Sequence, residues 1–384
     1  MKIVHICISA PYIDGWGYQA NLLPDYLNHL GTENYVIASF NNFPSYLKKD
    51  EIKEIQGKGE MYKYNGTTIY RIKTHSVSSS FIIPRKLMKV LKSIKPDIIF
   101  HHNINSTSLP IAARYSKKFG CLLYVDNHAD EINMSKNKLW VALYHKIIVR
   151  TSCRLYNKSI TKYFGVTKSR CDFISKFYKV DDSKIELLPI GADTKFADTI
   201  ESSKVLREKY GFSANDYIIV TGGKMGKYKG TDILIEAINK INTSKQNVKL
   251  ILFGKYEDSY TQELAESMPF ATQYGWCDRK KTLELLKLSD VACWPIHHTT
   301  LIEDAISVNT PLILRKTGTT EHLIDGNGVW INEPNEGKII SILESLINQD
   351  ETEKTLMKNA CEEMKNKLSY LNIASRIINH NNNM

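Results

Sequence analysis

Residues 216–241 read DYIIVTGGKMGKYKGTDILIEAINKI, which is an apolar strand, a loop rich in glycine and lysine, and an amphipathic helix. The loop matches neither the dinucleotide pattern G-x-G-x-x-G nor the P-loop pattern G-x-x-x-x-G-K-[ST]. In open α/β sheets, ligands bind beyond the carboxyl ends of parallel strands, where this loop begins. Lys224 and Lys229 are therefore placed to neutralise the charge of a phosphate group.

The same alternation of strand and helix extends along the chain on both sides of this loop. Most predicted strands are short apolar runs, as is typical of parallel strands covered on both faces. They span residues 2–8, 35–39, 97–101, 122–125, 163–166, 185–188, 217–221, 248–253, 272–274, 291–294, 311–314 and 328–331. Predicted helices include 19–30, 85–94, 232–241, 280–288, 301–308 and 336–348. The alternation predicts an α/β fold with doubly wound parallel sheets.

Length and rhythm indicate two domains. The chain has 384 residues, and domains average roughly 150 residues. The strand and helix rhythm restarts near residue 215, after a turn at Pro189-Ile190-Gly191-Ala192-Asp193. We therefore predict an N-terminal domain over residues 1–190, a C-terminal domain over 191–368, and a helix with a tail over 369–384.

Composition excludes several classes of protein. Hydrophobic residues make up 42 % and charged residues 24 %, which is ordinary for a globular protein. The seven cysteines are scattered without a C-x-x-C pair, so neither a disulfide framework nor a zinc site is indicated. The first residues read as a buried strand rather than a signal peptide, and no apolar run approaches the roughly 20 residues that cross a bilayer, so we expect a cytoplasmic protein. The net charge of +10 favours an anionic partner.

These features resemble the GT-B-fold glycosyltransferases, specifically the retaining family 4 that builds bacterial polysaccharides and glycolipids. Residues 223–237 follow the family pattern of Gly-Arg, five residues ending in Lys, and then Gly-x-Asp-x-Leu-Ile-x-Ala. Residues 301–311 resemble LLEAMAxGxP. Other matches occur in family order at Lys95-Pro96-Asp97, Pro189-Ile190-Gly191-Ala192-Asp193, Leu252-Phe253-Gly254, Tyr274-Gly275-Trp276 and Gly318-Thr319-Thr320-Glu321. The resemblance implies two Rossmann-like domains that face a cleft, and a tail able to pack back on the N-terminal domain.

The resemblance also implies a donor site in the C-terminal half. The family's Arg and Lys hold the donor diphosphate, which assigns that role to Lys224 and Lys229. Glu303 matches the ribose-binding second Glu of the family's Glu-x7-Glu motif, whereas Pro295 stands in place of the first Glu and the loop between them is short. Thr300 to Glu303 also fit T-x-x-E, a helix-capping box that needs no ligand. Other donor-side candidates are Thr299 and Thr300 at the helix N-terminus, His297 and His298 in the short loop, Gly254 and Trp276 beside the base pocket, and Glu321.

The N-terminal half supplies further candidates. The family has a glycine-rich loop after the first strand, near the donor phosphates, and Gly15 and Gly17 match it. A glycine there lets the backbone approach a phosphate, because it has no Cβ. His128, within Asp126-Asn127-His128-Ala129-Asp130, matches the family histidine beside the reaction centre, and is our candidate catalytic residue. His101 and His102 are its rivals.

Two basic segments of the N-terminal domain suggest a membrane partner. Residues 132–171 contain nine Lys and Arg, no Asp or Glu, and several interleaved aromatic residues. Residues 81–95 predict a second basic helix. Such helices suit an anionic membrane surface, and a solvated basic face over a buried apolar stripe is the alternative. No nucleic-acid-binding module is recognisable, so we expect no nucleic-acid partner.

The predicted function is transfer of a sugar from a nucleotide-sugar donor to a hydroxyl of a glycan or polyprenyl-linked acceptor in surface polysaccharide synthesis. A UDP-sugar is the expected donor, from the family's commonest use. The resemblance further implies retention of configuration, with no metal and no cofactor. The basic segments predict peripheral association of the cytoplasmic protein with the inner face of the plasma membrane. The alternatives are a sugar-nucleotide epimerase on the same fold, a homologue with impaired catalysis that only binds, and a basic nucleic-acid-binding protein.

Overall fold

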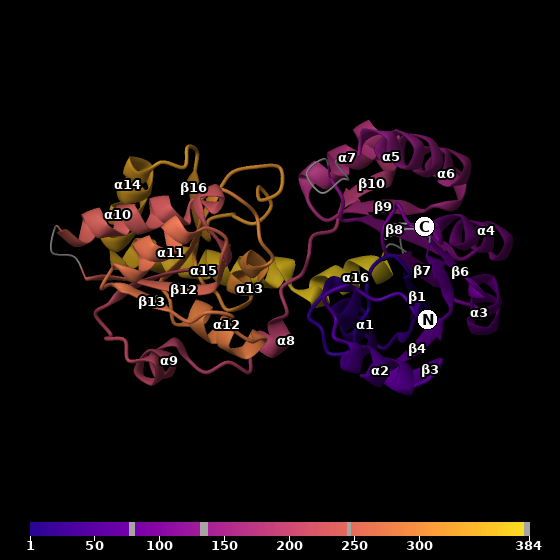
Figure 1. Cartoon of the computed structure of the whole chain (residues 1–384), viewed down its shortest axis with the longest axis horizontal. Helices are drawn as coiled ribbons and strands as arrows, with labels where there is room; N and C mark the ends of the chain where they lie inside the picture. Colours follow the sequence, from indigo (N-terminus) through magenta and orange to yellow (C-terminus); the bar gives the residue numbers. More distant parts are fainter. Residues whose placement is uncertain (77–80, 131–136, 244–246, 380–384) are drawn as a thin grey trace. The chain divides into compact units, whose positions relative to one another are not determined.

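A computed structural model describes residues 1–76, 81–130, 137–243 and 247–379 (Figure 1). The chain divides into two compact units. Unit 1 comprises Met1–Pro189 together with the end of the chain from Ile373, and unit 2 comprises Ile190–Asn372.

Unit 1 is an α/β unit with one large sheet and a separate two-stranded sheet. Its described strands are β1 (Lys2–Cys7), β2 (Glu33–Ser39), β3 (Met61–Tyr64), β4 (Thr67–Ile72), β5 (Thr74–Ser76), β6 (Ile82–Pro84), β7 (Ile98–His101), β8 (Leu122–Asn127), β9 (Lys162–Gly165) and β10 (Ile185–Leu187). The large sheet has the order β10-β9-β8-β7-β1-β2-β4-β3, in which the β3–β4 pair alone is antiparallel. β5 pairs with β6.

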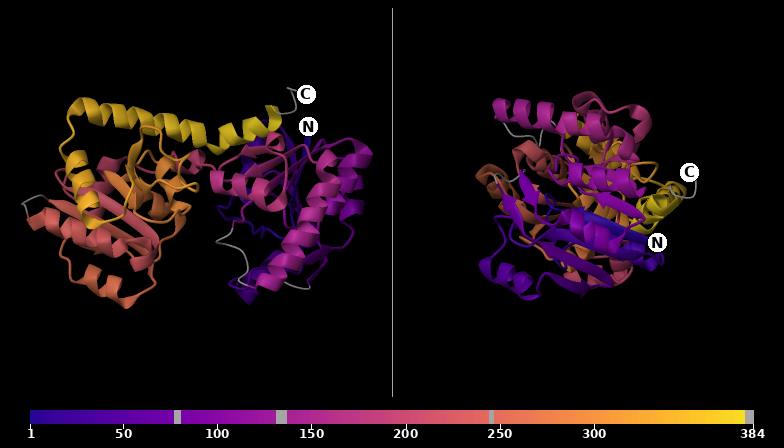
Figure 2. Two further views of the ribbon diagram at one scale, coloured as in Figure 1. Left: turned by 90° about the horizontal axis from the view of Figure 1, so that it is seen from above. Right: turned by 90° about the vertical axis from the view of Figure 1, so that its right-hand side faces the viewer.

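Helices lie between these strands, and the central strands are buried on both faces. The helical segments are α1 (Gln19–His29), α2 (Lys49–Gly57), α3 (Leu87–Ile94), α4 (Leu109–Phe119), α5 (Lys138–Trp140), η1 (Val141–Val149), α6 (Arg150–Tyr156), η2 (Asn157–Ser159), α7 (Lys168–Tyr178), η3 (Asp182–Lys184) and α16 (Tyr370–Asn379). All four residues of β7 are buried. Segments α5, η1 and α6 follow one another without a break, and η1 is π-helical (Figure 2).

The edge hairpin β3–β4 is an element that the sequence prediction omitted. Its strands are joined by Asn65 and Gly66, whose φ angles of 46° and 78° lie in the left-handed region. A two-residue turn with both residues left-handed matches the twist of a hairpin and favours Asn-Gly. The hairpin places Arg71, near the end of β4, beside β2.

Unit 2 has one parallel sheet. Its described strands are β11 (Tyr217–Met225), β12 (Val248–Tyr256), β13 (Ala271–Gln273), β14 (Val291–Trp294), β15 (Leu312–Arg315) and β16 (Gly328–Ile331), in the order β13-β12-β11-β14-β15-β16. The helical segments are α8 (Thr194–Ala197), α9 (Ser203–Tyr210), η4 (Lys227–Lys229), α10 (Thr231–Thr243), α11 (Ser259–Glu266), α12 (Arg279–Lys287), α13 (Leu301–Ser307), α14 (Glu336–Ile347) and α15 (Glu351–Leu368).

Two apolar cores flank the sheet of unit 2. Successive residues of β11 point to opposite faces, so Ile218 and Val220 join one core and Ile219 joins the other. Helices α9, α12, α13 and α15 contribute to the first core, and α10, α11 and α14 to the second. The predicted α/β architecture with doubly wound parallel sheets is confirmed, and each of the twelve predicted strands is present.

One boundary differs from the prediction in a way that matters for the site. Residues 222–225, predicted as a loop, extend β11, because they pair with the end of β12 in the register Gly223↔Gly254 and Lys224↔Lys255. The first part of the glycine-rich sequence is therefore the end of β11, and it pairs with the end of β12.

The end of the chain returns to unit 1. From Ile373, α16 groups with residues 1–189. Arg376 Nη2 donates to Glu186 Oε1 and to the Leu187 carbonyl, both at 2.7 Å, and so ties α16 to β10. None of the helices in the described part of the chain has the length and apolarity needed to span a membrane.

Candidate functional site

The donor-side candidates of unit 2 gather where β11, β12 and β14 end. Gly254 has a φ of 117°, and a Cβ on it would lie 2.0 Å from the Gly223 carbonyl oxygen. A Cβ on Gly223 would meet Leu301 Cδ1 at 3.1 Å and Thr299 Oγ1 at 3.8 Å. These glycines therefore allow two strand ends and the start of α13 to pack closely together.

Glu257 pairs with Lys224 and also acts on the pKa of Lys229. Lys224 Nζ lies 3.4 Å from Glu257 Oε1, and the Lys224 side chain is largely exposed. Burial lowers the pKa of Lys229, Glu257 opposes the shift, and Lys224 adds to it. A third lysine of the segment, Lys227, is directed elsewhere, with its Nζ 3.6 Å from the centroid of the Tyr260 ring. Two cations with one shared counter-charge form a site that a bound anion would stabilise.

The short loop before α13 packs against these lysines. Trp294 Nε1 donates to the Gly222 carbonyl at 3.1 Å, which fixes the start of the loop on β11. His297 lies with its ring 6.0 Å from the Tyr228 ring. Burial lowers the pKa of His297, and the neighbouring cations Lys229 and Arg315 lower it further. His297 is therefore neutral and belongs to the same cationic surroundings as Lys229.

The predicted capping box at Thr300 and Glu303 is wrong. Thr300 is the N-cap of α13, but its side chain makes no capping hydrogen bond. Glu303 instead places Oε1 at 3.1 Å from His298 Nε2. The Glu303 side chain is buried, and its Oε2 has no hydrogen-bond partner among the described residues. A buried carboxylate oxygen without a partner is costly, so this oxygen is available to a ligand hydroxyl.

A second carboxylate, Asp304, follows directly and was not among the predicted site residues. Burial raises the pKa of Asp304 to about 6, Arg279 opposes this shift, and Glu303 and Asp193 add to it. Asn309 has a left-handed φ of 62°. That conformation marks the glycine of the LLEAMAxGxP pattern. Counting back from Asn309 and Pro311 puts Asp304 at the pattern's Glu.

Trp276 and Glu321 are two further donor-side candidates, and both lie outside the group formed by Lys224, Lys229 and Glu303. Trp276 is 82 % exposed and follows Gly275, whose φ is 61°. Glu321 is exposed in a turn after β15, where its backbone N–H donates to the Thr317 carbonyl. Within the described residues, neither side chain is recorded in contact with Lys224, Lys229 or Glu303.

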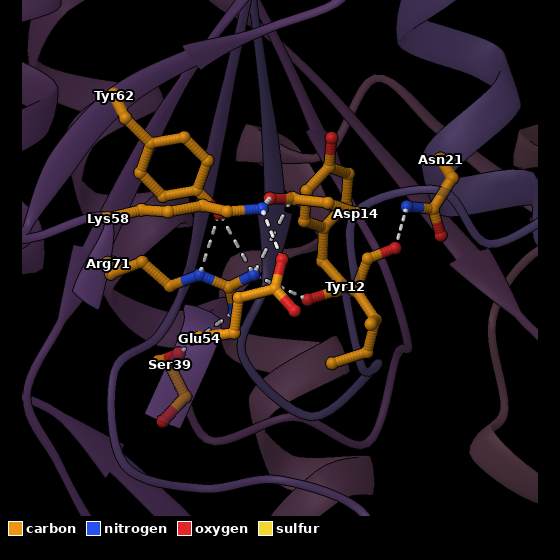
Figure 3. A network of polar contacts seen from close by, with 9 residues as sticks. Tyr12, Asp14, Asn21, Ser39, Glu54, Lys58, Tyr62 and Arg71 are labelled. Carbon is orange, nitrogen blue, oxygen red and sulfur yellow. Dashed lines mark hydrogen bonds and ion pairs between the residues drawn. The ribbon is translucent and has the colours of Figure 1, made fainter. Parts of the chain in front are cut away.

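In unit 1, Gly15 and Gly17 lie on the exposed loop after β1. Gly15 has a φ of 81°, which requires glycine at the turn. The preceding Asp14 is anchored by Lys58 Nζ and by the Tyr62 hydroxyl, each at 3.0 Å (Figure 3).

Arg71 is a site residue that the sequence reasoning missed. Its guanidinium is buried and donates to the carbonyls of Tyr12 at 2.9 Å and Ser39 at 3.2 Å (Figure 3). These bonds fix the segments that follow β1 and β2. Arg71 also lines a cavity of about 420 Å³ between these segments, whose wall includes Tyr12, Phe43 and Tyr46. A cavity with aromatic walls and several serine hydroxyls suits part of a sugar or lipid-linked acceptor.

His128 follows the buried end of β8. Its Nε2 lies 3.3 Å from Asp126 Oδ2, and its side chain is 35 % exposed. Of its rivals, His101 is fully buried with Nε2 2.8 Å from Ser108 Oγ, and His102 is buried with Nδ1 2.7 Å from Asp126 Oδ2. Only His128 of the three can touch a substrate directly. The described residues contain no group of three or more His, Cys, Asp or Glu that could hold a metal ion.

Comparisons with known proteins agree on the class. Residues 202–363 match the family Glycosyl transferases group 1. An uncharacterized glycosyltransferase of Methanocaldococcus jannaschii is 21 % identical over 226 residues, which cover 56 % of this chain and 58 % of the relative. The D-inositol 3-phosphate glycosyltransferase of Xylanimonas cellulosilytica is 23 % identical over 203 residues, 48 % of each protein. The chain thus matches about half the length of these curated relatives.

Solved structures match over nearly the whole chain. A glycosyltransferase from Rickettsia africae has a TM-score of 0.69 at 15 % identity, with 98 % of this chain and 96 % of that chain covered. HepE of Anabaena, in complex with UDP-glucose, has a TM-score of 0.63 at 16 % identity, with both chains covered in full. The chain therefore has the GT-B fold, with two Rossmann-like domains. Together with the family match, the fold supports a GT-B glycosyltransferase.

Proposed function

We propose that the protein transfers a sugar from a nucleotide-sugar donor, a UDP-sugar, to a hydroxyl of a glycan or lipid-linked acceptor in surface polysaccharide synthesis. The observation that carries the proposal is the pair of Lys224, near the end of β11, and Lys229, in η4, of which Lys224 forms an ion pair with Glu257 and Lys229 is partly buried, with Glu257 raising its pKa and Lys224 lowering it. The pair lies inside the region that matches the glycosyltransferase family. The UDP-glucose complex of a protein with the same fold supports the donor class.

In the proposed reaction, the lysines stabilise the diphosphate as it leaves. Fixed positive charge aimed at a developing negative charge is commonly the largest contribution to catalysis. Leu301 and Thr299 lie against Gly223, and we propose that the start of α13, with Thr299 and Thr300, forms the phosphate side of the donor site. We propose that the acceptor hydroxyl attacks from the same face as the leaving group, with retention, and that His128 orients a hydroxyl near the sugar.

The test of this function is turnover with a panel of UDP-, GDP-, ADP- and dTDP-sugars. Each sugar is incubated with and without candidate acceptor glycans, and nucleoside diphosphate release and products are measured. Release that depends on an acceptor and yields a glycoside supports the proposal. Isomerisation of the free nucleotide sugar without any acceptor would indicate an epimerase instead. Saturable binding without any turnover would indicate a homologue that only binds.

Glu303 and Asp304 give a first prediction, which concerns the donor ribose. We propose that the ribose hydroxyls bind to Asp304, at the position of the pattern's Glu, with Glu303 held by His298. Since the pKa of Asp304 is raised to about 6, its carboxylate is lost as the pH falls through 6. We therefore expect KM for the donor to rise below pH 6 in the wild type. Asp304→Asn should raise KM at pH 7.5 and remove this pH dependence.

Glu303→Gln is the matched variant for that test, because it changes the neighbouring carboxylate by the same chemistry. It should keep the rise in KM but move it to lower pH, because the charge of Glu303 adds to the raised pKa of Asp304. If Glu303→Gln removes the pH dependence of the donor KM and Asp304→Asn keeps it, the ribose is bound by Glu303 and not by Asp304.

We also propose that unit 1 docks on an anionic membrane through α5, η1 and α6. Apart from Thr151, every exposed residue between 138 and 158 is a large aliphatic or a cation: Lys138, Leu139, Leu143, Lys146, Ile147, Ile148, Arg154, Leu155 and Lys158. Such a face combines apolar insertion with about 1 kcal/mol per basic residue near the surface. The part of the predicted segment over 132–136 lies outside the described residues.

The other basic segment, 81–95, behaves differently. The apolar residues Leu87, Leu91 and Ile94 of α3 are buried in the core of unit 1. Its lysines therefore form a solvated basic face, which adds charge but little apolar surface.

The docking face gives a second prediction. Leu143→Asp combined with Leu155→Asp should lower affinity for phosphatidylglycerol vesicles at least about tenfold, because burying a leucine side chain contributes roughly 1.5–3 kcal/mol. Vesicle co-sedimentation measures the effect. Leu356→Asp, at a leucine of unit 2 that is 64 % exposed, is the matched control and should bind as the wild type does. Equal vesicle binding by the double variant would contradict the proposal.

A further inference from the structure

A row of polar side chains crosses the interior of unit 1 and ends at His128. We name Asn34, His5, His102, Asp126 and His128 the histidine relay. Asn34, His5 and Asp126 lie on β2, β1 and β8, His102 directly follows β7, and His128 follows β8. The first four members are at most 1 % exposed. Along it, Nε2 of His128 lies 3.3 Å from Asp126 Oδ2, which lies 2.7 Å from His102 Nδ1. His102 Nε2 lies 3.4 Å from His5 Nδ1, and His5 Nε2 lies 3.4 Å from Asn34 Oδ1.

The direction of these hydrogen bonds is set at the Asn34 end. Asn28 Nδ2 donates to the Asn65 carbonyl at 3.2 Å, so the Oδ1 atom of Asn28 is free to accept from Asn34 Nδ2 at 2.9 Å. Asn34 Nδ2 also donates to Thr32 Oγ1 at 2.8 Å. A carbonyl oxygen cannot donate, so these contacts orient Asn34 with its Oδ1 as an acceptor toward His5.

His5 passes this direction on to His102. Because Asn34 Oδ1 only accepts, His5 Nε2 carries the hydrogen. Burial lowers the pKa of His5 to about 3, and His102 lowers it further, so His5 holds a single proton. Its Nδ1 is therefore a lone pair, and His102 Nε2 must donate to it.

His102 then carries a hydrogen on both nitrogens. Burial raises the pKa of Asp126, but His102 and His128 outweigh burial and hold it below its usual value, so Asp126 is a carboxylate. The carboxylate accepts from His102 Nδ1 and, through Oδ1, from the Asn103 backbone N–H at 2.7 Å. These hydrogen bonds give His102 two donor contacts, one to His5 and one to the carboxylate of Asp126.

The pair determines how His128 faces a substrate. Asp126 accepts from His128 Nε2, which leaves the lone pair on Nδ1. Asp126 is in contact with the ring nitrogens of His102 and His128 and accepts from the Asn103 backbone N–H. Arg170 Nε donates to the His128 carbonyl at 2.9 Å and holds the backbone in place.

We propose that Asp126, which is also hydrogen-bonded to His102, is a positioning residue that keeps His128 as its Nε2–H tautomer. The Nδ1 atom of His128 is then presented as a hydrogen-bond acceptor for a sugar hydroxyl. The inference rests on the proposed function only for the identity of that hydroxyl. Other titratable groups near the relay are His101, with a pKa lowered to about 3 by burial, Cys7, with a pKa raised by burial, and the pair of Arg170 and Asp130 at 3.4 Å.

Nitrogen NMR of the full-length protein, labelled with ¹⁵N-histidine, tests the relay without any enzyme assay. We expect hydrogens on both ring nitrogens of His102 near neutral pH, and a hydrogen only on Nε2 of His128. A His102 with one hydrogen, or a His128 with its hydrogen on Nδ1, would overturn the inference. This readout in the wild type stands even if no nucleotide sugar is turned over, and it needs no variant to fold.

The positioning role is tested by Asp126→Asn, with His101→Asn as the control. His101, the last residue of β7, is as buried as Asp126 but is not a member of the relay, because it contacts Ser108 instead. Asp126→Asn should mix the tautomers of His128 and lower kcat by roughly 10²-fold, a typical contribution of acid–base positioning, with little change in donor KM. In a His128→Ala background it should cause no further loss of kcat. Unchanged kcat, or the same loss in that background, would overturn the role.

Discussion

Replacing Lys229 with alanine lowers kcat/KM for the UDP-sugar by roughly 10²–10³-fold, because fixed positive charge at the leaving diphosphate is lost in a partly buried site. Lys229 is the lysine whose pKa burial lowers, which marks it as the member of the pair whose charge is least screened by water. Steady-state kinetics at pH 7.5 with saturating acceptor measures the loss.

Two variants separate this effect from a general loss of charge. Lys229→Arg keeps a cation and should retain most activity, although it replaces a point charge by a planar fork. Lys227→Ala removes a lysine from the same segment, but its ammonium group lies over the Tyr260 ring, so activity should stay near the wild-type value. If Lys227→Ala lost as much activity as Lys229→Ala, the diphosphate would not be bound by Lys229 in particular.

The second large effect is structural. Gly254→Ala should destabilise unit 2 by roughly 3 kcal/mol or more, since a Cβ would lie 2.0 Å from the Gly223 carbonyl oxygen at a φ of 117°. The variant forces apart the ends of β11 and β12, which also carry Lys224, so donor binding should fail with it. Urea denaturation followed by far-UV circular dichroism measures the loss.

Gly211→Ala is the matched control for Gly254→Ala. Gly211 is also left-handed, with a φ of 78°, but a Cβ there would have no neighbour within 4 Å. Gly211→Ala should lower the free energy of unfolding by roughly 1–2 kcal/mol, the cost of the left-handed backbone conformation alone. Equal destabilisation by the two variants would show that the close approach of β11 and β12 contributes nothing.

Much of the fold is predictable because its central strands are buried on both faces. Such strands read as short apolar runs, and those of both large sheets were recognisable. The hairpin β3–β4 was missed because β3, at the sheet edge, alternates between exposed and half-buried residues, and β4 begins with alternating buried and half-buried ones. The dipeptide Asn65-Gly66 was the available signal, since it favours the two-residue turn that the structure contains.

The site was predictable where a motif lies on one continuous segment. Lys224 lies near the end of β11 and Lys229 in the turn that follows it, and the two lysines are close enough for Lys224 to lower the pKa of Lys229. The capping box at Thr300 failed because Glu303 has a competing partner, His298, that spacing alone does not exclude. Asp304 was missed because the pattern was aligned from Leu301 rather than from the left-handed Asn309.

The histidine relay could not be predicted, because it depends on register. Its members come from four strands or from the residues that directly follow them, and parallel pairing such as Ile6↔His101 brings His5 and His102 within reach. Adjacent side chains at a strand end point in different directions, so His101 and His102 cannot share one partner. In the structure the two histidines have different partners, Ser108 and Asp126.

The most direct test of the central claim is calorimetric titration of UDP into the full-length protein. We predict saturable binding by the wild type and by Lys227→Ala, and loss of at least about 1.4 kcal/mol, a tenfold drop in affinity, in the double variant Lys224→Ala/Lys229→Ala. Undiminished UDP binding by a folded double variant would contradict the account, because the nucleotide would then bind without the two lysines on which the proposed function rests.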